Sequence, residues 1–384
     1  MTHPFKENIL YIGNFKDGTG WGNAAEGNIL ALDSVPEFNV IPSVVSYKNS
    51  GHKHTPEIDQ ITRRANKLRS THEDFEPKWV IQHVLPHLYH YDSRFWNIGF
   101  LDCESSDFRA TGWQHHINLM DELWVPSENN RTIALRSGVN IPVNVVPHSI
   151  DISKYNRHKL GSGLKIKELE NSYNFGFVGE FIQRKNLKSL VQAFNLEFEP
   201  EEPVNLFIKT SGSLNAVQKF CSDIKMGLKT RNRFKEELII TDRMKHEDYI
   251  SVLCQIDTFV MPSRGEGFCI PALECQALGA NILYTEGIGM DWCCGDSVPS
   301  KPEYCFGAVE GISNVDTADS EWYEISLHEL RRKMRDEYEK FLVDFKKPYM
   351  KNDKSVCHAQ GFDHKQIGRQ MFNLMKGGGH GTHI

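Results

Sequence analysis

The sequence alternates short apolar runs with longer stretches in which apolar residues recur every three or four positions. A short apolar run predicts a buried strand, whereas the longer stretches have the period of a helix with one buried face. This alternation is typical of a parallel sheet covered by helices. In the first half we interpret Gly22–Leu32 as a helix and the following runs as strands: Ile9–Ile12, Val80–His83, Trp96–Asp102, Glu122–Pro126 and Val143–Pro147.

The second half repeats the pattern after a polar stretch, Ser153–Ser172, which we interpret as the connection. A charged helix over His328–Phe345 and another near His364–Met375 are expected to follow, with Glu321–Leu330 beginning these last helices. The pattern predicts an α/β protein with two doubly wound halves, in which ligands bind at the carboxyl ends of the strands. Its predicted strands are Phe175–Gly179, Asn205–Lys209, Glu237–Thr241, Asp257–Met261 and Asn281–Tyr284.

Length and composition add limits to this picture. A chain of 384 residues is long for a single core and favours two domains. A net charge of -6 with no strong basic run argues against a protein that holds nucleic acid mainly by bulk charge. Nine cysteines without a C-x-x-C pair favour reduced thiols. No signal region or membrane span is recognisable, so we expect a cytoplasmic protein, in the host cytoplasm if it is viral.

The most informative stretch is Met261–Gly279, whose sequence is MPSRGEGFCIPALECQALG. It follows a predicted strand and leads through a glycine loop into a helix from about Pro271, where proline suits the first turn. Glu266 lies in the loop, and Glu274 lies about one turn inside the helix. The free N–H groups of a helix N-terminus favour a phosphate. Two acceptors for sugar hydroxyls beside a phosphate site describe a nucleotide-sugar pocket.

This wording resembles the E-x7-E signature of glycosyltransferase family 4, the retaining enzymes with the GT-B fold, some of which are encoded by phages. The resemblance implies that Glu266 contacts the transferred sugar, that Glu274 holds the ribose, and that Gly265, Gly267 and Phe268 line the donor site. It also implies two Rossmann-like domains facing each other across a cleft. We expect these over residues 1–152 and 153–347, with a helix in 348–376 packing back on the first domain and a flexible tail over 377–384.

A second basic motif follows the first predicted strand of the second half, in Gly179-Glu-Phe-Ile-Gln-Arg-Lys-Asn186. Cations in such a loop can neutralise a diphosphate as the leaving group gains charge. Arg184-Lys185-Asn186 resembles a variant of the basic motif that the family uses for this task. The resemblance implies a phosphate role for Lys185 and Arg184. In the family an arginine follows the glycine, whereas this sequence has Glu180 there. The resemblance therefore implies no phosphate role for Glu180.

The first half supplies candidates for the sugar and the acceptor. Gly18, Gly20 and Trp21 lie in a glycine-rich turn between the first strand and first helix, and such a turn lets backbone approach a ligand closely. Its spacing does not fit G-x-G-x-x-G, which makes a dehydrogenase a weak alternative. His83 ends a predicted strand, where the family often places a histidine that contacts the sugar. Glu104 and Asp107 follow another predicted strand and are candidate acceptor residues; His148 and Ser149 are expected beside the link between the domains.

The histidines have no metal-ligand spacing and no Asp-x-Asp motif stands in a metal-binding context, so we predict no metal and no cofactor. A UDP- or GDP-sugar is the expected donor, and the acceptor is a hydroxyl of a glycan, a lipid-linked glycan or a small molecule. Two alternatives remain: a viral enzyme that modifies a hydroxymethylated base in DNA, and an inactive GT-B protein that only binds a nucleotide or sugar. A basic group, Arg63, Arg64, Lys67 and Arg69, would favour DNA, but it also fits the solvated face of a helix.

Overall fold

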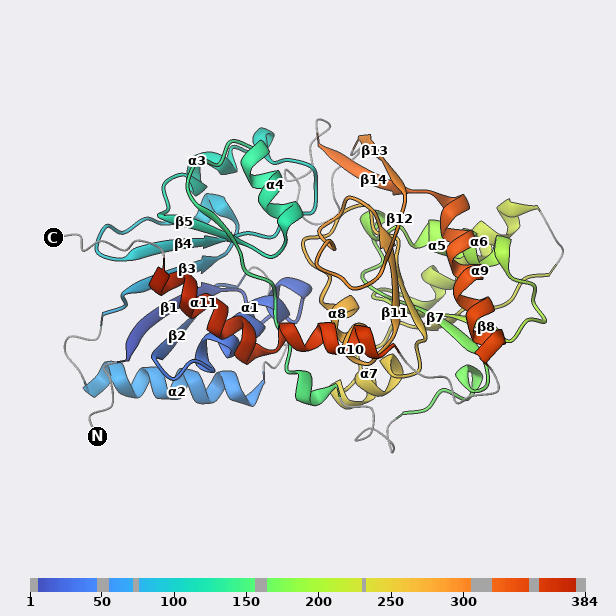
Figure 1. The fold of residues 1–384 in the computed structure, drawn as a ribbon, viewed down its shortest axis with the longest axis horizontal. Coiled ribbons are helices and arrows are strands. Elements are labelled where there is room, and N and C mark those ends of the chain that lie inside the picture. Colours follow the sequence, from blue (N-terminus) through green and yellow to red (C-terminus); the bar gives the residue numbers. More distant parts are fainter. Residues whose placement is uncertain are drawn as a thin grey trace. The chain divides into compact units, whose positions relative to one another are not determined.

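The computed structural model describes residues 6–46, 55–71, 76–155, 164–229, 233–304, 320–344 and 352–377. The chain divides into two compact units. The first unit contains Met1–Cys103, Asp107–Ile152 and Gly361–Ile384, and the second contains Glu104–Ser106 and Ser153–Gln360. In Figure 1 each unit has its own sheet with helices around it. None of the described helices is both long and apolar enough to span a membrane.

The sheet of the first unit has six parallel strands in the order β2-β1-β3-β4-β5-β6. The five strands predicted from the sequence are confirmed, and β2 is an addition. Pro42 lies inside β2, which is tolerated because β2 is an edge strand. The strands are β1 (Glu7–Gly13), β2 (Phe38–Val44), β3 (Trp79–His83), β4 (Trp96–Phe100), β5 (Glu122–Val125) and β6 (Val143–Val145).

Five α-helices are described in the first unit, and the last of them comes from the far end of the chain. This helix, α11, packs on α1, and Ile367, Met371 and Met375 join the same buried core as strands β1 and β3. Gly368 allows this close approach, because a Cβ there would collide with the Ala31 carbonyl oxygen. The helices are α1 (Gly20–Asp33), α2 (Pro56–Thr71), α3 (Trp113–Ile117), α4 (Glu128–Arg136) and α11 (His364–Gly377).

The second unit has its own six-stranded parallel sheet, in the order β12-β11-β10-β7-β8-β9. The five strands predicted for this half are again confirmed. Its core is rich in aromatic side chains, among them Tyr173, Phe175 and Phe194. The strands are β7 (Tyr173–Val178), β8 (Val204–Lys209), β9 (Leu238–Ile240), β10 (Thr258–Met261), β11 (Asn281–Thr285) and β12 (Asp296–Val298).

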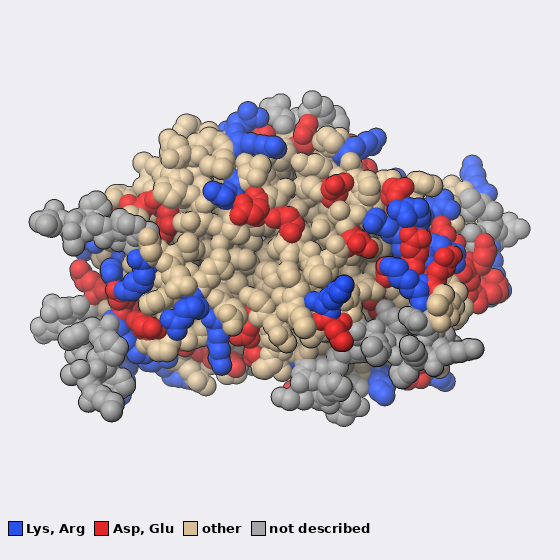
Figure 2. Space-filling model, viewed as in Figure 1, with Lys and Arg blue, Asp and Glu red and all other residues tan. Residues whose placement is uncertain are grey.

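The helices of the second unit include the predicted charged helix, α9. Figure 2 shows acidic and basic side chains intermixed over α9, where Arg331 and Arg335 pair with Glu197. The α-helices are α5 (Leu187–Glu197), α6 (Leu214–Leu228), α7 (His246–Leu253), α8 (Ile270–Ala277), α9 (Leu327–Asp344) and α10 (Asp353–Ala359).

Two predicted segments differ from the structure. Glu321–Ile325 does not begin the last helices: it is a strand, β14, paired antiparallel with β13 (Ser300–Tyr304). Its aromatic and β-branched residues Trp322, Tyr323 and Ile325 favour a strand. Residues 348–376 contain two helices, of which α10 packs on α8 in the second unit and only α11 packs on α1. Part of the predicted connection (156–163) and the tail after 377 lie outside the described residues.

Candidate active site

Two neighbouring strands of the second unit bring the basic motif and the first glutamate together. Strands β7 and β10 pair in parallel, so the loops that follow them start at the same edge of the sheet. The loop after β7 contains a short 3-10 turn, Gln183–Lys185, and the loop after β10 contains Glu266. The Arg264 N–H donates to the Arg184 carbonyl oxygen at 2.7 Å, which joins the two loops directly.

Glu266 is buried, with 4% of its surface exposed, and cations surround its carboxylate. The Lys185 Nζ donates to both Glu266 oxygens, at 2.6 and 2.9 Å. Arg184 Nη1 lies 3.5 Å from Oε1 of the same carboxylate. Burying a charged carboxylate is costly without such partners, and here the cations supply both charge and hydrogen bonds.

Arg184 also joins the loops through its other contacts. Its Nη1 donates to the Gly265 carbonyl oxygen at 2.5 Å, and its Nη2 pairs with Glu104 at 2.8 Å. A Cβ on Gly265 would collide with the Glu104 carbonyl oxygen, so this position requires glycine. We call Glu104, Arg184, Lys185 and Glu266 the Glu266 cluster. It holds two cations and two carboxylates, of which Glu104 is partly exposed.

The charges of the cluster set the protonation of Glu266. Burial on its own raises the pKa of this carboxyl, but Lys185 and Arg184 outweigh burial and hold the pKa below its usual value. Glu266 is therefore ionised at neutral pH and accepts hydrogen bonds.

Glu274 has a different environment eight residues later, in α8. Its side chain is buried, and each oxygen accepts one short hydrogen bond: Oε1 from the Tyr155 hydroxyl and Oε2 from the Tyr249 hydroxyl, both at 2.6 Å. Burial raises the pKa of Glu274, and the two phenols oppose this rise only in part. Hydroxyl groups, rather than cations, hold this second carboxylate.

The start of α8 is tightly constrained. The Phe268 ring is buried and stacks on Trp292 with ring centroids 4.3 Å apart, and the Trp292 indole N–H donates to the Phe268 carbonyl oxygen at 2.8 Å. Cys269 follows with φ 72, a left-handed conformation unusual for a residue other than glycine. Pro271 stands in the first turn, as the sequence predicts. Phe268 is thus held in place by Trp292, and the predicted donor contacts of Gly265, Gly267 and Phe268 stay predictions.

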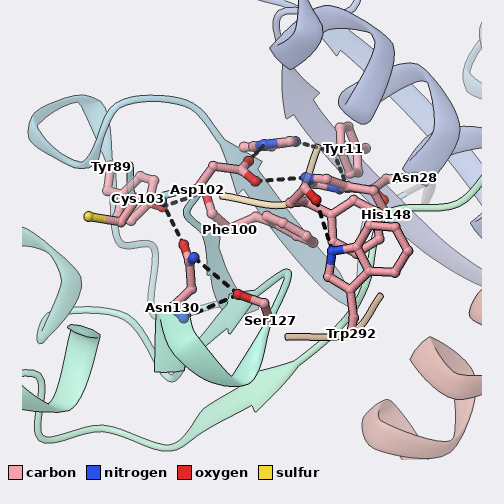
Figure 3. Close-up of polar contacts among 12 residues, drawn as sticks. Tyr11, Asn28, Tyr89, Phe100, Asp102, Cys103, Ser127, Asn130, His148 and Trp292 are labelled. Atoms are coloured by element: carbon pink, nitrogen blue, oxygen red, sulfur yellow. Dashed lines mark hydrogen bonds and ion pairs between the residues drawn. The ribbon is translucent and has the colours of Figure 1, made fainter. Parts of the chain in front are cut away.

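In the first unit, His83 lies inside a chain of buried hydrogen bonds, of which Figure 3 labels Tyr11, Asn28, Asp102 and His148. Its Nδ1 is 2.8 Å from the Tyr11 hydroxyl, and its Nε2 is 3.0 Å from Asp102 Oδ2. The pKa of Asp102 is lowered, so its ionised carboxylate can only accept, and the proton of the neutral His83 ring sits on Nε2; Nδ1 then accepts from the Tyr11 O–H, and the Tyr11 oxygen accepts from Asn28 Nδ2. His148 Nε2 lies 2.7 Å from the other Asp102 oxygen. We call Tyr11, Asn28, His83, Asp102 and His148 the His83 network.

Burial lowers the pKa of His83, although Asp102 opposes the change, so the ring is neutral. Only 1% of the His83 surface is exposed and both ring nitrogens are engaged. A sugar contact by this ring would have to replace one of these bonds, and the predicted role of His83 stays a prediction.

The other predicted residues of the first unit lie in separate places. Gly18 is exposed in the turn before α1, and Gly20 is exposed as the first residue of the helix, which Thr19 caps by accepting from the Gly22 N–H. Trp21 follows in the first turn and packs edge-on to His83, with ring centroids 5.8 Å apart. The turn is therefore ordered, and its ligand contacts stay a prediction.

The two predicted acceptor residues belong to different units. Glu104 pairs with Arg184 in the second unit, whereas Asp107 in the first unit bonds the backbone and side chain of Arg109. Ser149 bonds the Gly27 carbonyl oxygen and lies 2.8 Å from His364 Nδ1, which ties the end of the β6 segment to α1 and α11.

The remaining sequence candidates concern DNA and metals. The basic group around Arg64 lies on α2, where Arg64 pairs with Asp33. Within the residues that the structure describes, no three His, Cys, Asp or Glu side chains gather as a metal-binding group. Among the described cysteines, Cys221, Cys269, Cys293, Cys294 and Cys357 carry free thiols.

Several residues of the site have no signal in the sequence. Glu324 on β14 accepts from Arg264 Nε at 2.6 Å and from Asn186 and Ser189 at 3.1 Å, and so holds both loops of the Glu266 cluster. Tyr155 and Tyr249 are isolated aromatic residues far from Glu274 in the chain. Ser263 is the exception, because it stands in the Met-Pro-Ser sequence directly before the glycine loop, where a contact with that loop can be expected. Its hydroxyl donates to the Gly265 carbonyl oxygen at 2.9 Å.

Comparison with known proteins gives two findings. Residues 172–297 match the family described as glycosyl transferases group 1, and this range includes both Lys185 and Glu266. No curated protein matches the chain.

Solved structures share the fold over nearly the whole chain. Sucrose-phosphate synthase from Thermosynechococcus elongatus has a TM-score of 0.64 at 12% identity, covering 97% of this chain and 99% of that one. HepE from Anabaena, in complex with UDP and glucose, has a TM-score of 0.65 at 13% identity, with 97% and 100% covered. A glycosyltransferase from Rickettsia africae has a TM-score of 0.62 at 10% identity, with 98% and 100% covered. The family match over residues 172–297 and the GT-B fold of two parallel six-stranded sheets support a glycosyltransferase.

Proposed function

We propose that the protein is a retaining glycosyltransferase that moves a sugar from a UDP- or GDP-sugar to a hydroxyl acceptor. The observation that carries the proposal is the Glu266 cluster, in which Lys185 and Arg184 hold Glu266 at the edge of the second sheet. Glu274 stands eight positions later on the helix that follows. A structure of similar fold, HepE, has been solved with UDP-glucose, which supports a uridine donor as the first to be tested.

Lys185 and Arg184 are proposed to bind the donor diphosphate. An ammonium group has three donors, and the bonds to Glu266 use two of them. Arg184 adds a planar guanidinium whose contact with the partly exposed Glu104 can be exchanged for a phosphate oxygen. Both cations would stabilise the charge that develops on the leaving diphosphate. No metal is needed for this step, because the two side chains supply the positive charge.

Glu266 is proposed to accept hydrogen bonds from hydroxyls of the transferred sugar. Because its pKa is held low, it stays an acceptor and does not serve as a general acid at neutral pH. Glu274 is proposed to hold the ribose. The two carboxylates therefore have separate roles and do not form the acid and nucleophile pair of a retaining glycosidase. The acceptor proton would pass to an oxygen of the leaving diphosphate as the acceptor attacks from the same face.

The test is a panel of UDP- and GDP-sugars, each measured for thermal stabilisation of the protein, for hydrolysis and for transfer. A donor that binds the folded state raises the melting temperature. Glycans, small glycosides and hydroxymethylated DNA serve as acceptors, so that the DNA-modifying alternative is tested directly. The anomeric configuration of the product, read by NMR, must match that of the donor. If no nucleotide sugar binds or is turned over, the proposal fails.

Glu266→Gln separates sugar binding from diphosphate binding. The variant loses the acceptor charge for the sugar, and we expect kcat/KM to fall by about 10²–10³-fold. It also frees Lys185 and Arg184 from their buried counter-charge, so UDP or GDP without a sugar should bind at least as tightly as to the wild type. Glu180→Gln, at an exposed position near the same loop, is the control and should change neither quantity. Unchanged transfer in Glu266→Gln would remove this glutamate from the site.

A further inference from the structure

We propose that Tyr155 and Tyr249 position Glu274 and make the site selective for ribonucleotide over deoxyribonucleotide donors. This inference rests on the proposed function, because it assigns residues to the ribose end of the same donor. Its basis is the pair of hydrogen bonds, each 2.6 Å long, that reach the two oxygens of Glu274 from two different tyrosines.

The three residues come from separate parts of the second unit. Tyr155 follows the short turn Ile152–Lys154, Tyr249 lies on α7, and Glu274 lies on α8. Groups from two other segments thus hold both oxygens of the Glu274 carboxylate, and these two contacts fix its orientation. Tyr155 is itself buried and packs edge-on to His246, with ring centroids 6.3 Å apart, so its own position is fixed.

The hydrogen bonds leave acceptor capacity for a ligand. An ionised carboxylate can accept about four hydrogen bonds, two on each oxygen. Each phenol occupies one acceptor position on one Glu274 oxygen. One acceptor position on each oxygen is then left for a ligand that carries two neighbouring hydroxyls. The 2′- and 3′-hydroxyls of a ribose are such a pair, whereas a deoxyribose offers only one hydroxyl there. An acceptor left unpaired in a buried site costs binding energy, so selectivity follows.

The phenols also favour the ionised form of Glu274, which accepts. Burial raises the pKa of Glu274, and the hydrogen bonds from Tyr155 and Tyr249 lower it. The thiol of Cys269, which also interacts with Glu274, has its pKa raised to about 12 by burial and so adds no charge. Without the two hydroxyls, burial would favour a protonated Glu274, which gives up an acceptor position to its own proton.

The experiment measures the dissociation constants of UDP, GDP and their 2′-deoxy forms by calorimetry for the wild type, Tyr155→Phe, Tyr249→Phe and the double variant. Each single variant should lower the preference for ribose by about fivefold to tenfold, the value of one ordinary hydrogen bond, mainly through weaker ribonucleotide binding. With the donor that the wild type turns over, KM should rise by a similar factor while kcat changes less.

A matched control is Tyr173→Phe, which removes a buried phenol bonded to Thr258 at 2.7 Å in the same unit. It should leave the preference for ribose unchanged. An unaltered ribose preference in folded single variants, or an equal loss for ribose and deoxyribose forms, would overturn the inference and leave the proposed function standing. If the wild type binds none of the four nucleotides, the proposed function itself fails, and the inference fails with it.

Discussion

The Glu266 cluster in the second unit and the His83 network in the first unit both surround a buried carboxylate, but they balance its charge differently. Glu266 is paired with two cations, Lys185 and Arg184. Asp102 lies between two histidine rings, at 2.7 and 3.0 Å, and His83 among them is neutral. One carboxylate is compensated by fixed charge and the other by hydrogen bonds.

The difference indicates which region can exchange a partner for a ligand. Lysine and arginine keep their charge when a phosphate approaches, so an anion can join or replace Glu266 as their partner. The neutral His83 ring offers no such charge, and each bond broken at this ring leaves a buried polar group unsatisfied. We therefore expect changes in the Glu266 cluster to alter activity, and changes in the His83 network to alter stability.

The largest expected effect is that of Lys185→Met on activity. Loss of the ammonium group should lower kcat/KM by about 10²–10³-fold, because the leaving diphosphate loses a cation. Burial then acts on Glu266 with less opposition and raises its pKa, so the remaining activity should decline at a higher pH than in the wild type as the solution is acidified. Steady-state rates from pH 4.5 to 8 measure both effects. Lys188→Met, an exposed lysine on α5, is the control.

Asp102→Asn should have the next largest effect, on stability. An amide cannot accept from both histidines, so one of their N–H groups loses its partner inside the protein. We expect a loss of about 2–4 kcal/mol in the free energy of unfolding, measured in urea. The value of kcat/KM per folded molecule should stay within about threefold of the wild type; a loss of about a hundredfold would instead place the His83 network in the catalytic machinery.

The pH dependence of stability gives a smaller and more specific effect. Because burial lowers the pKa of His83, the folded ring is neutral at a pH where the unfolded ring, with its ordinary pKa of 6.5, binds a proton. Stability should fall as the pH is lowered through 6.5 towards the folded pKa, by at most about 1.4 kcal/mol per pH unit from this group. In His83→Gln the fall should be shallower. Identical slopes in the two proteins would contradict a neutral, buried His83.

The smallest expected effect is that of Tyr11→Phe. It removes the hydroxyl that links Asn28 to His83, and we expect a loss of about 1 kcal/mol with unchanged activity. Thermal unfolding and the transfer assay measure the two quantities. A change in the acceptor KM, with stability unaltered, would show that the network reaches the substrate.

The sequence predicted most of the fold because parallel strands buried on both faces are continuous apolar runs. The edge strand β2 escaped prediction, since Pro42 interrupts its pattern. Strand β14 was taken for a helix start because Glu321–Ile325 directly precedes the charged pattern of α9.

Within the candidate site, Glu266 and Lys185 could be recognised because each stands in a local motif at the end of a strand. Glu324, Tyr155 and Tyr249 could not, because they reach the site from segments far away in the sequence, and a single sequence carries no sign of such contacts. The hydrogen bond from His83 to Asp102 could not be predicted for the same reason, because nineteen positions separate the two residues in the sequence.

The return of α11 to the first unit has a consequence for how the chain is made. The first unit lacks Ile367, Met371 and Met375 in its core until the last helix has been synthesised, whereas nearly all of the second unit is complete earlier. On the ribosome, the second unit can therefore finish folding first, although it is made second. A fragment that ends before residue 361 should expose the apolar surface of α1 and aggregate, while a fragment of the second unit alone retains its own sheet.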